Sequence, residues 1–444
     1  MEMNDSHNRL LVSLVTVAAL SLAPLATAKQ VGLDVSMANP LLLAGNKQTA
    51  YMKVGLTGFT LEPAGERSPV NVALVIDKSG SMSGDKIRKA REAALMAVDR
   101  LGSEDIISVV AYASSVSVLV PATKVSNRTA IRQGINRLEA NGGTALFAGV
   151  SKGAAEVRKF LGRDRVNRVI LISDGQANVG PDSPQELGDL GASLAKEGIS
   201  VTTIGLGNGY NEDLMARLAS RSDGNHAFAE ASNDLARIFD HEFGDITSVV
   251  AQEISIHIKC ARGVRPVRVL GRLADISGQS VNLCLNQLYS DQEKYVMLEV
   301  EVPAGREGRS QDIATIEIAY ANMDTRTTDK LKSGVAVRFT ASADDVTRSV
   351  DQEAMTDAVL EIATETNRMA VELRAKGQKD EAKKMLVKNH GYLQKYGTLY
   401  KSKKLNSYAG DNMRSARNLD DGEWDAERKR MTEEQSVNSL QRAW

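Results

Sequence analysis

The sequence predicts an α/β protein in which a doubly wound, mostly parallel sheet is inserted in an antiparallel β-sandwich and followed by a C-terminal helical hairpin. Between residues 68 and 250, continuous Val, Ile and Leu runs alternate with segments of helical periodicity, as in strands buried on both faces and joined by crossover helices. Residues 29–67 and 251–342 instead show short alternating strands separated by Gly, Asn and Asp, which is the antiparallel pattern. Residues 343–406 carry apolar side chains at spacings of three and four, as in amphipathic helices.

The first 28 residues differ from the rest of the 444-residue chain. Arg9 is the only positive charge before the apolar run at 10–22, and residues 26–28, Ala-Thr-Ala, have the small side chains of a signal-peptidase site. We expect residues 1–28 to be a signal peptide that is cleaved after Ala28, so that the mature protein is periplasmic or secreted. Retention of this segment as an anchor is the alternative, although its strongly apolar part is short for a bilayer.

The overall charge argues against partners that are polyanions. The formal net charge is −1, so no strong field attracts nucleic acid or an anionic membrane surface. After the signal peptide no segment approaches the roughly 18 uncharged apolar residues of a transmembrane helix. We therefore expect no nucleic acid partner and no membrane span in the mature chain.

The two β segments are expected to form one unit. Residues 29–67 are too few to form a core alone, so we expect them to pair with strands of residues 251–342, with the α/β domain at 68–250 inserted between them. The later segment contains both cysteines, Cys260 and Cys284, which are a plausible disulfide pair in an oxidising compartment. Two buried free thiols are the alternative.

The C-terminal part divides into a helical and a polar section. Residues 343–406 fit a helical hairpin that turns near Gly377 and packs its apolar side against the β region. Residues 407–444 are rich in Asn, Asp, Arg and Glu. We expect this tail to be mobile apart from one short helix.

The stretch DKSGSMSG at residues 77–84 directly follows the apolar run at 70–76. Ligands of open parallel sheets gather at the carboxyl ends of the strands, where Asp77 is expected to lie. A carboxylate at the end of a buried strand requires a counter-charge or several donors, and a bound cation is one solution. Ser79 and Ser81 can add oxygens to the same point, and oxygen-only ligands suit Mg²⁺, Mn²⁺ or Ca²⁺.

Two other loops provide further oxygens. NGGTAL at 141–146 places Thr144 in a loop that leads into a helix, and VILISDG at 169–175 places Asp174 at the end of another buried strand. An Asx-turn followed by a helix N-cap would explain the serines of the first loop without any metal. It would not explain Thr144 and Asp174.

Asp-x-Ser-x-Ser, then a threonine in a second loop, then an aspartate at a strand end resembles the von Willebrand factor A (VWA) domain family, and the larger arrangement resembles bacterial secreted proteins that contain this domain. The resemblance covers about 180 residues, including the strand and helix order of its Rossmann-like fold. It implies a metal-ion-dependent adhesion site with magnesium as the first choice of ion. The residues that match the family motif are Asp77, Ser79, Ser81, Thr144 and Asp174.

The charges of these residues predict what such a site would do. Two carboxylates balance a divalent cation, and neutral hydroxyls and water complete its shell, so a carboxylate from a partner can replace a water. We therefore expect cation-dependent capture of an Asp or Glu residue of another protein. The alternative is a structural or assembly subunit of an envelope complex, in which the metal site is regulatory or vestigial.

The same stretch argues against catalysis and against an EF-hand. A phosphotransferase with an aspartate nucleophile usually needs a second carboxylate two residues later, where this chain has Ser79. The G-x-S-x-G pattern of serine hydrolases is absent from the stretch. An EF-hand loop starting at Asp77 would need Gly and Glu where the chain has Met82 and Arg88. We expect a binding protein rather than an enzyme.

Overall fold

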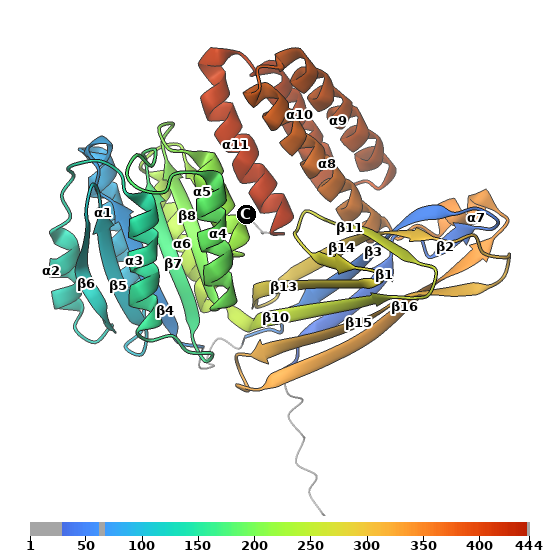
Figure 1. Ribbon diagram of the computed structural model, residues 1–444, viewed down its shortest axis with the longest axis horizontal. Coiled ribbons are helices and arrows are strands. Elements are labelled where there is room, and N and C mark those ends of the chain that lie inside the picture. Colours follow the sequence, from blue (N-terminus) through green and yellow to red (C-terminus); the bar gives the residue numbers. More distant parts are fainter. Residues whose placement is uncertain (1–28, 62–66, 442–444) are drawn as a thin grey trace, which may run out of the picture.

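The computed structural model describes residues 29–61 and 67–441, so the expected signal peptide at 1–28 lies outside the described residues. The predicted fold class is confirmed: an α/β domain sits beside a β-sandwich, and a group of helices packs above the junction of the two (Figure 1). Within these residues no helix is both long and apolar enough to cross a bilayer.

The α/β domain has a six-stranded sheet with the order β6-β5-β4-β7-β8-β9, in which only the edge strand β6 is antiparallel to its neighbour. Its strands are β4 (Val70–Asp77), β5 (Ile106–Tyr112), β6 (Val116–Lys124), β7 (Val166–Ser173), β8 (Ile199–Leu206) and β9 (His226–Ala229). Every residue of β4, β5, β7 and β8 is buried, as their continuous apolar runs predict.

Helices cover both faces of this sheet. One apolar core forms under α1 (Asp85–Arg100), α2 (Arg128–Asn136) and α6 (Asp234–Thr247). A second forms on the opposite face under α3 (Leu146–Arg158), α4 (Pro184–Lys196) and α5 (Glu212–Arg221). This is the doubly wound arrangement, in which the loops at the carboxyl ends of the strands share one edge of the sheet.

The β-sandwich combines strands from both sides of the α/β domain. One sheet has the order β1-β3-β14-β11 and the other β12-β13-β10-β15-β16-β2. Their bounds are β1 (Gly32–Met37), β2 (Leu41–Leu43), β3 (Gln48–Thr57), β10 (Val249–Cys260), β11 (Arg265–Leu270), β12 (Asp275–Ser277), β13 (Ser280–Tyr289), β14 (Glu293–Val302), β15 (Ser310–Asn322) and β16 (Thr328–Thr340). Because β3 pairs with β14 and β2 with β16, the N-terminal segment completes both sheets.

The two cysteines do not form the disulfide that the sequence suggested. Both are free, with Cys260 buried and Cys284 exposed. They lie on neighbouring strands, but Cys284 stands opposite Ser255, and five residues of β10 separate this position from Cys260. At about 3.3 Å per residue this offset is roughly 17 Å, far beyond the reach of a disulfide.

The C-terminal region has more helices than the predicted hairpin. It contains α7 (Ala343–Arg348), α8 (Gln352–Ala375), α9 (Lys379–Leu399), α10 (Lys403–Arg417) and α11 (Asp421–Ser439). Gly377 makes the predicted turn between α8 and α9 with a φ of 79°. A side chain would be strained in this left-handed conformation.

The expectation of a mobile tail at 407–444 is wrong for the part that the structure describes. Helix α11 buries Trp424 and Met431 against α8, and its polar side chains have partners. Lys429 Nζ lies 3.0 Å from Glu212 Oε2, and both side chains are almost fully buried. Charged residues of this segment therefore form ion pairs with the α/β domain instead of facing only solvent.

The α/β domain is joined to the β-sandwich by a buried polar network around Arg168 of β7. Its guanidinium contacts the Glu242 carboxylate on α6 and the Gln287 side chain on β13, and it donates to Tyr289 Oη at 3.0 Å. Arg168 and Glu242 are 0% and 1% exposed. The network fixes the first sheet against the second at the point where the chain passes between them.

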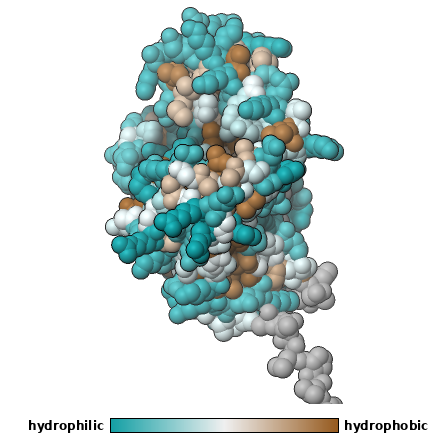
Figure 2. Space-filling view, turned by 90° about the vertical axis from the view of Figure 1, so that its right-hand side faces the viewer, coloured by the Kyte–Doolittle hydropathy of each residue, from teal (hydrophilic) through white to brown (hydrophobic). Residues whose placement is uncertain are grey.

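The end of the molecule that lies away from the α/β domain, formed by the sandwich and the helices, is mostly hydrophilic. Figure 2 shows this end, where hydrophobic residues occur in small groups among hydrophilic ones. Exposed apolar side chains on the helices include Met369, Val387 and Leu399. Isolated exposed apolar residues of this kind are normal for a folded protein.

Candidate metal centre

The five residues that the sequence singled out lie at the carboxyl edge of the α/β sheet. Asp77 is the last residue of β4, and Asp174 follows β7, the strand beside it. Ser79 and Ser81 lie on a short 3₁₀ turn that includes Gly80–Met82, directly after β4. Thr144 lies in the loop before α3. Three separate loops thus bring these side chains to one edge.

Hydrogen bonds link four of the five residues. Ser79 Oγ and Ser81 Oγ are 3.1 Å apart, and Ser81 Oγ donates to Asp174 Oδ1 at 2.7 Å. The backbone N–H of Ser79 donates to Asp77 Oδ1 at 2.8 Å. The first loop is therefore connected directly to both aspartates.

Gly175, in the third loop, marks a point on which oxygens of the first two loops converge. A Cβ atom built at this glycine would lie 3.2 Å from Thr144 Oγ1, 3.5 Å from Ser81 Oγ and 3.7 Å from Asp77 Oδ2. The structure thus brings Thr144 together with the other predicted residues. Any side chain at position 175 would intrude among these oxygens.

Backbone bonds hold the loops in this arrangement. The Gly80 N–H donates to the Gly142 carbonyl at 3.0 Å, which ties the first loop to the second. The Thr144 N–H donates to Asn178 Oδ1 at 2.8 Å, and the Asn178 N–H donates to the Thr144 carbonyl at 3.1 Å. This reciprocal pair ties the second loop to the third. Sequence reasoning missed Asn178, because a loop asparagine four residues after Asp174 carries no motif signal.

Burial makes the Asp77 carboxylate costly in its ionised form. Desolvation raises the pKa of Asp77, and the nearby Asp174 carboxylate acts in the same direction. The hydroxyl of Ser173, which donates to Asp77 Oδ2 at 2.7 Å, and the Ser79 N–H oppose the shift. Within residues 29–61 and 67–441 no basic side chain forms an ion pair with Asp77; the nearby Lys86 pairs with Asp174 instead.

Asp174 differs because it has an internal counter-charge. The ammonium group of Lys86, from the first turn of α1, contacts Asp174 Oδ2. This lysine side chain is 34% exposed, whereas Asp174 is fully buried. Sequence reasoning missed Lys86 because an isolated lysine at the start of an amphipathic helix is usually only a solvated residue.

The donor set fits a hard divalent cation. All five predicted side chains offer oxygen, and the buried Asp77 carboxylate lacks a positive partner at the point where the oxygens converge. Mg²⁺, Mn²⁺ and Ca²⁺ prefer such ligands, whereas Zn²⁺ favours His and Cys. Asp77, Ser79, Ser81, Thr144 and Asp174 are the residues that would hold the ion.

A second group of carboxylates is already neutralised by a lysine. Glu293, Glu353 and Asp357 lie close enough together to hold a metal ion. Lys53 Nζ lies among them, at 2.9, 2.9 and 2.8 Å from their oxygens. Its side chain is 3% exposed, so this cluster is a structural ion-pair network between β3, β14 and α8.

Comparison with known proteins supports the fold and the domain type. Residues 71–241 match the family model of the von Willebrand factor type A domain. The chain is similar to the uncharacterized protein sll0103 of Synechocystis sp., with 29% identity over 53% of this chain and 57% of that protein. It is also similar to the uncharacterized protein YfbK of Escherichia coli, with 28% identity over 48% of this chain and 37% of that protein. The chain thus spans less than two thirds of each relative.

Among solved structures, the chain is similar to one described as von Willebrand factor type A from Catenulispora acidiphila. The TM-score is 0.72 with 17% identity, and the match covers 92% of this chain and 96% of that one. At this level of identity the similarity shows a common fold, and here it extends through the sandwich and the helices as well as the α/β domain.

Proposed function

Residues 71–241 are a von Willebrand factor type A domain, a domain type that generally mediates protein–protein interaction, and we propose that this one captures an acidic residue of a partner protein through a bound divalent cation. The observation that carries the proposal is the convergence of Thr144 Oγ1, Ser81 Oγ and Asp77 Oδ2 beside Gly175. Mg²⁺ is the first choice of ion, with Mn²⁺ and Ca²⁺ as alternatives.

Each residue of the site has a defined part in this function. Asp77 and Asp174 supply the negative charge, and Ser79, Ser81 and Thr144 supply neutral oxygens. When bound, the ion supplies a Lewis-acidic position that an incoming Asp or Glu carboxylate can occupy in place of water. Ser173 holds the Asp77 carboxylate in place by a 2.7 Å hydrogen bond. Asn178 holds the backbone of Thr144.

Lys86 tunes the charge balance. Its ammonium already offsets part of the Asp174 charge, so it competes with a divalent cation for that carboxylate. It also leaves additional positive charge at the edge where an acidic partner residue would arrive. Both effects make the site dependent on a partner carboxylate to complete the charge balance.

We further propose that the protein works in the periplasm or outside the cell as a binding protein rather than as an enzyme. The expected signal peptide at 1–28 supports this location. Ser79, which occupies the place where a phosphotransferase would carry its second carboxylate, supports binding without catalysis.

The test is an Asp77→Ala variant. Because this change removes half of the carboxylate charge of the site, we expect Mn²⁺ or Mg²⁺ affinity in calorimetry to fall by about tenfold or more. Capture of partners from an envelope extract should fall with it, and EDTA should abolish capture by the unchanged protein. The control is Asp85→Ala, which removes an exposed carboxylate eight positions along the chain.

Two outcomes would contradict the proposal. One is equal metal affinity in Asp77→Ala and the unchanged protein. The other is capture of the same partner by Asp77→Ala in the presence of EDTA. The second result would favour the alternative, an assembly subunit that binds its partners through the sandwich and the helices, with a regulatory or vestigial metal site.

A further inference from the structure

A large cleft lies where the α/β domain, the β-sandwich and the C-terminal helices meet. Its volume is about 1400 Å³. Its walls come from α4 and α5 on one side, from α8 and α11 on another, and from the end of β11 and the middle of β13 below. In Figure 1 this is the region between α4 and α5, the lower part of α11 and the near end of the sandwich.

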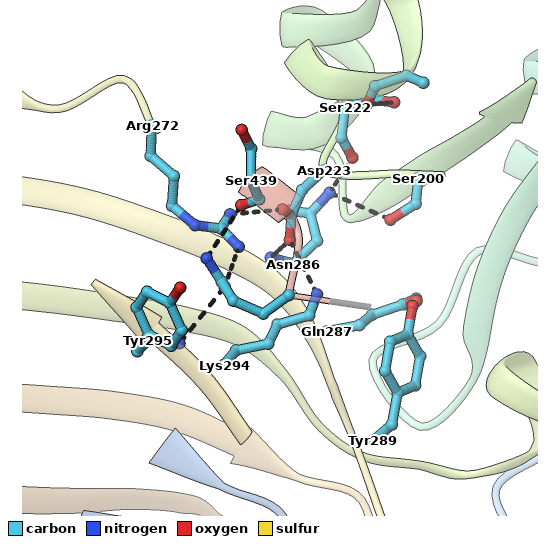
Figure 3. Close-up of polar contacts among 12 residues, drawn as sticks. Ser200, Ser222, Asp223, Arg272, Asn286, Gln287, Tyr289, Lys294, Tyr295 and Ser439 are labelled. Carbon is cyan, nitrogen blue, oxygen red and sulfur yellow. Dashed lines mark hydrogen bonds and ion pairs between the residues drawn. The ribbon is translucent and has the colours of Figure 1, made fainter. Parts of the chain in front are cut away.

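A polar cluster forms the floor of the cleft and is internally satisfied. Asp223 accepts from the Asn286 N–H at 2.6 Å and from the Arg272 guanidinium at 3.1 Å, and Lys294 Nζ lies 3.8 Å away. Figure 3 shows these side chains pointing toward one another, with Asn286 also reaching Ser200. One carboxylate faces two bases in this cluster, so the floor carries no unpaired acidic charge.

Most acidic side chains on the walls are neutralised by bases that are not part of the cleft. These pairs are Glu197 with Arg158, Glu365 with Arg268 and Asp213 with Arg428. A further pair, Glu253 with Arg163, lies on the rim. Among the acidic residues of the walls that the structure describes, Glu372 alone has no ion pair.

Four basic side chains of the walls have no acidic partner among the residues at 29–61 and 67–441. They are Lys196, Arg217, Arg221 and Arg368. With only Glu372 to set against them, the cleft has an excess of three positive charges, four minus one. Low-dielectric walls strengthen the field of such an excess inside a cleft.

Two glycines of α4, Gly188 and Gly191, leave room for two of these arginines to lie beside each other. A Cβ at Gly188 would lie 3.1 Å from Arg217 Cγ and 3.5 Å from Arg221 Cγ, and a Cβ at Gly191 would meet the backbone of α5. The two helices therefore approach closely, and both arginine stems lie over the glycine face of α4. Arg368 of α8 faces the same cleft from the other side.

We propose that this cleft is a second interaction site that binds an acidic segment of a partner protein. The volume exceeds the range of about 300–1,000 Å³ that is usual for small-molecule sites, so it suits a length of polypeptide. Guanidinium groups pair with carboxylates through two parallel hydrogen bonds, which suits Arg217, Arg221 and Arg368 to Glu and Asp side chains.

The basic residues of this site are separate from the candidate metal centre. Lys196 and Arg221 are the last residues of α4 and α5, which places them toward the amino ends of the strands, although the lining also reaches Asp213 at the start of α5. The metal-site loops follow the carboxyl ends of β4 and β7. The eight residues of β8 span roughly 25 Å between these two edges. An acidic peptide in the cleft therefore needs no cation.

The test uses the full chain and a fluorescein-labelled decaglutamate peptide in EDTA, with fluorescence anisotropy as the readout. We expect saturable binding that weakens as NaCl rises from about 50 to about 500 mM. The variant Arg217→Gln/Arg221→Gln/Arg368→Gln should bind about tenfold more weakly or worse. The control Arg262→Gln/Arg306→Gln/Arg309→Gln removes the same charge from exposed sandwich loops and should bind like the unchanged chain.

A second readout uses the exposed thiol that lines the cleft. Maleimide labelling of Cys284 should be slower when decaglutamate is bound, and decaglutamine should give no protection. Circular dichroism and thermal melting establish that both triple variants fold. The proposal is overturned if decaglutamate fails to bind saturably, or if the two triple variants bind it equally. It is also overturned if binding requires Mg²⁺ or is lost in Asp77→Ala.

Discussion

At the scale of single residues, the candidate metal site requires a glycine at position 175. Gly175 lies next to Asp174 in the third loop, and its missing side chain leaves open a point that oxygens of the first two loops share. We expect Gly175→Ala to weaken Mn²⁺ and Mg²⁺ binding by about tenfold or more, because the methyl group would occupy part of the coordination space. The change should cost little stability, about 1 kcal/mol or less, since the φ of Gly175 is not left-handed and its neighbours are side-chain oxygens.

The matched control is Gly244→Ala in α6, where an added methyl group meets nothing within 4 Å. Alanine favours a helix over glycine by about 1 kcal/mol, so this control should melt at the same or a higher temperature and keep its metal affinity. Calorimetry with Mn²⁺ distinguishes the two variants. Unchanged affinity in Gly175→Ala would remove the central argument for the coordination geometry.

The sequence predicted the members of the candidate site but not what positions them. Asp77, Ser79 and Ser81 follow one apolar run, and Asp174 follows another, so strand ends alone bring them to one edge. Lys86 and Asn178 carry no comparable pattern, because their contacts to Asp174 and Thr144 depend on how the loops fold. Their roles become visible only from the three-dimensional arrangement.

At the scale of elements, Glu434 of α11 makes the stability of the folded chain depend on pH. Burial raises the pKa of Glu434 to about 9 from 4.5, and the Asp411 carboxylate on α10 adds to the effect. The folded chain thus keeps a proton that the unfolded chain loses, so stability falls as the pH rises from about 4.5 to about 9. Glu434→Gln should remove this loss and gain on the order of 1–3 kcal/mol near the upper end of the window.

Urea unfolding at several pH values measures the effect. The control Asp425→Asn changes an exposed carboxylate on the same helix and should leave the pH dependence as it is. If Glu434→Gln showed the same decline in stability toward pH 9 as the unchanged chain, this carboxyl group would not be its source.

Two errors of prediction also belong to the scale of elements. Helix α11 looked like a solvated tail because its polar residues are many, yet Lys429 and Glu427 find buried partners in Glu212 and Ser415. The cysteines looked like a pair because their segment is short, but strand register sets Cys284 opposite Ser255. Ion partners and register depend on tertiary contacts, so local sequence patterns did not contain them.

At the scale of the whole molecule, the Arg168 network joins the inserted domain to its host. Replacement by Met removes the guanidinium that pairs with the buried Glu242, although Thr202 and Asn225 still contact this carboxylate. We expect Arg168→Met to lower the free energy of unfolding by about 3 kcal/mol, as is typical when one partner of a buried ion pair is removed. Urea denaturation of the full chain measures this.

The double variant Arg168→Met/Glu242→Gln provides the comparison, because it removes the charge of Glu242 as well. It should recover a substantial part of the loss. A loss below about 1 kcal/mol in the single variant would mean that the junction does not depend on this ion pair.

The organisation of the whole chain was predictable to a large extent. Continuous apolar runs identified the parallel sheet, and alternating runs on both sides identified an antiparallel unit divided by an insertion. The sequence did not predict the pairing of β2 with β16 or the ion pairs that bind α11 to α5. These depend on contacts between segments far apart in the chain.

The division of the sandwich also sets an order of events during synthesis. Lys53 on β3 and Glu293 beside it on β14 are 240 positions apart. At about 5–20 residues per second, a ribosome needs roughly 12 to 50 seconds to make the chain between them. The α/β domain can complete its own sheet in that interval, while the edge of β3 that will pair with β14 has no partner strand. Protection of that edge before its partner emerges is therefore a requirement that this topology places on the cell.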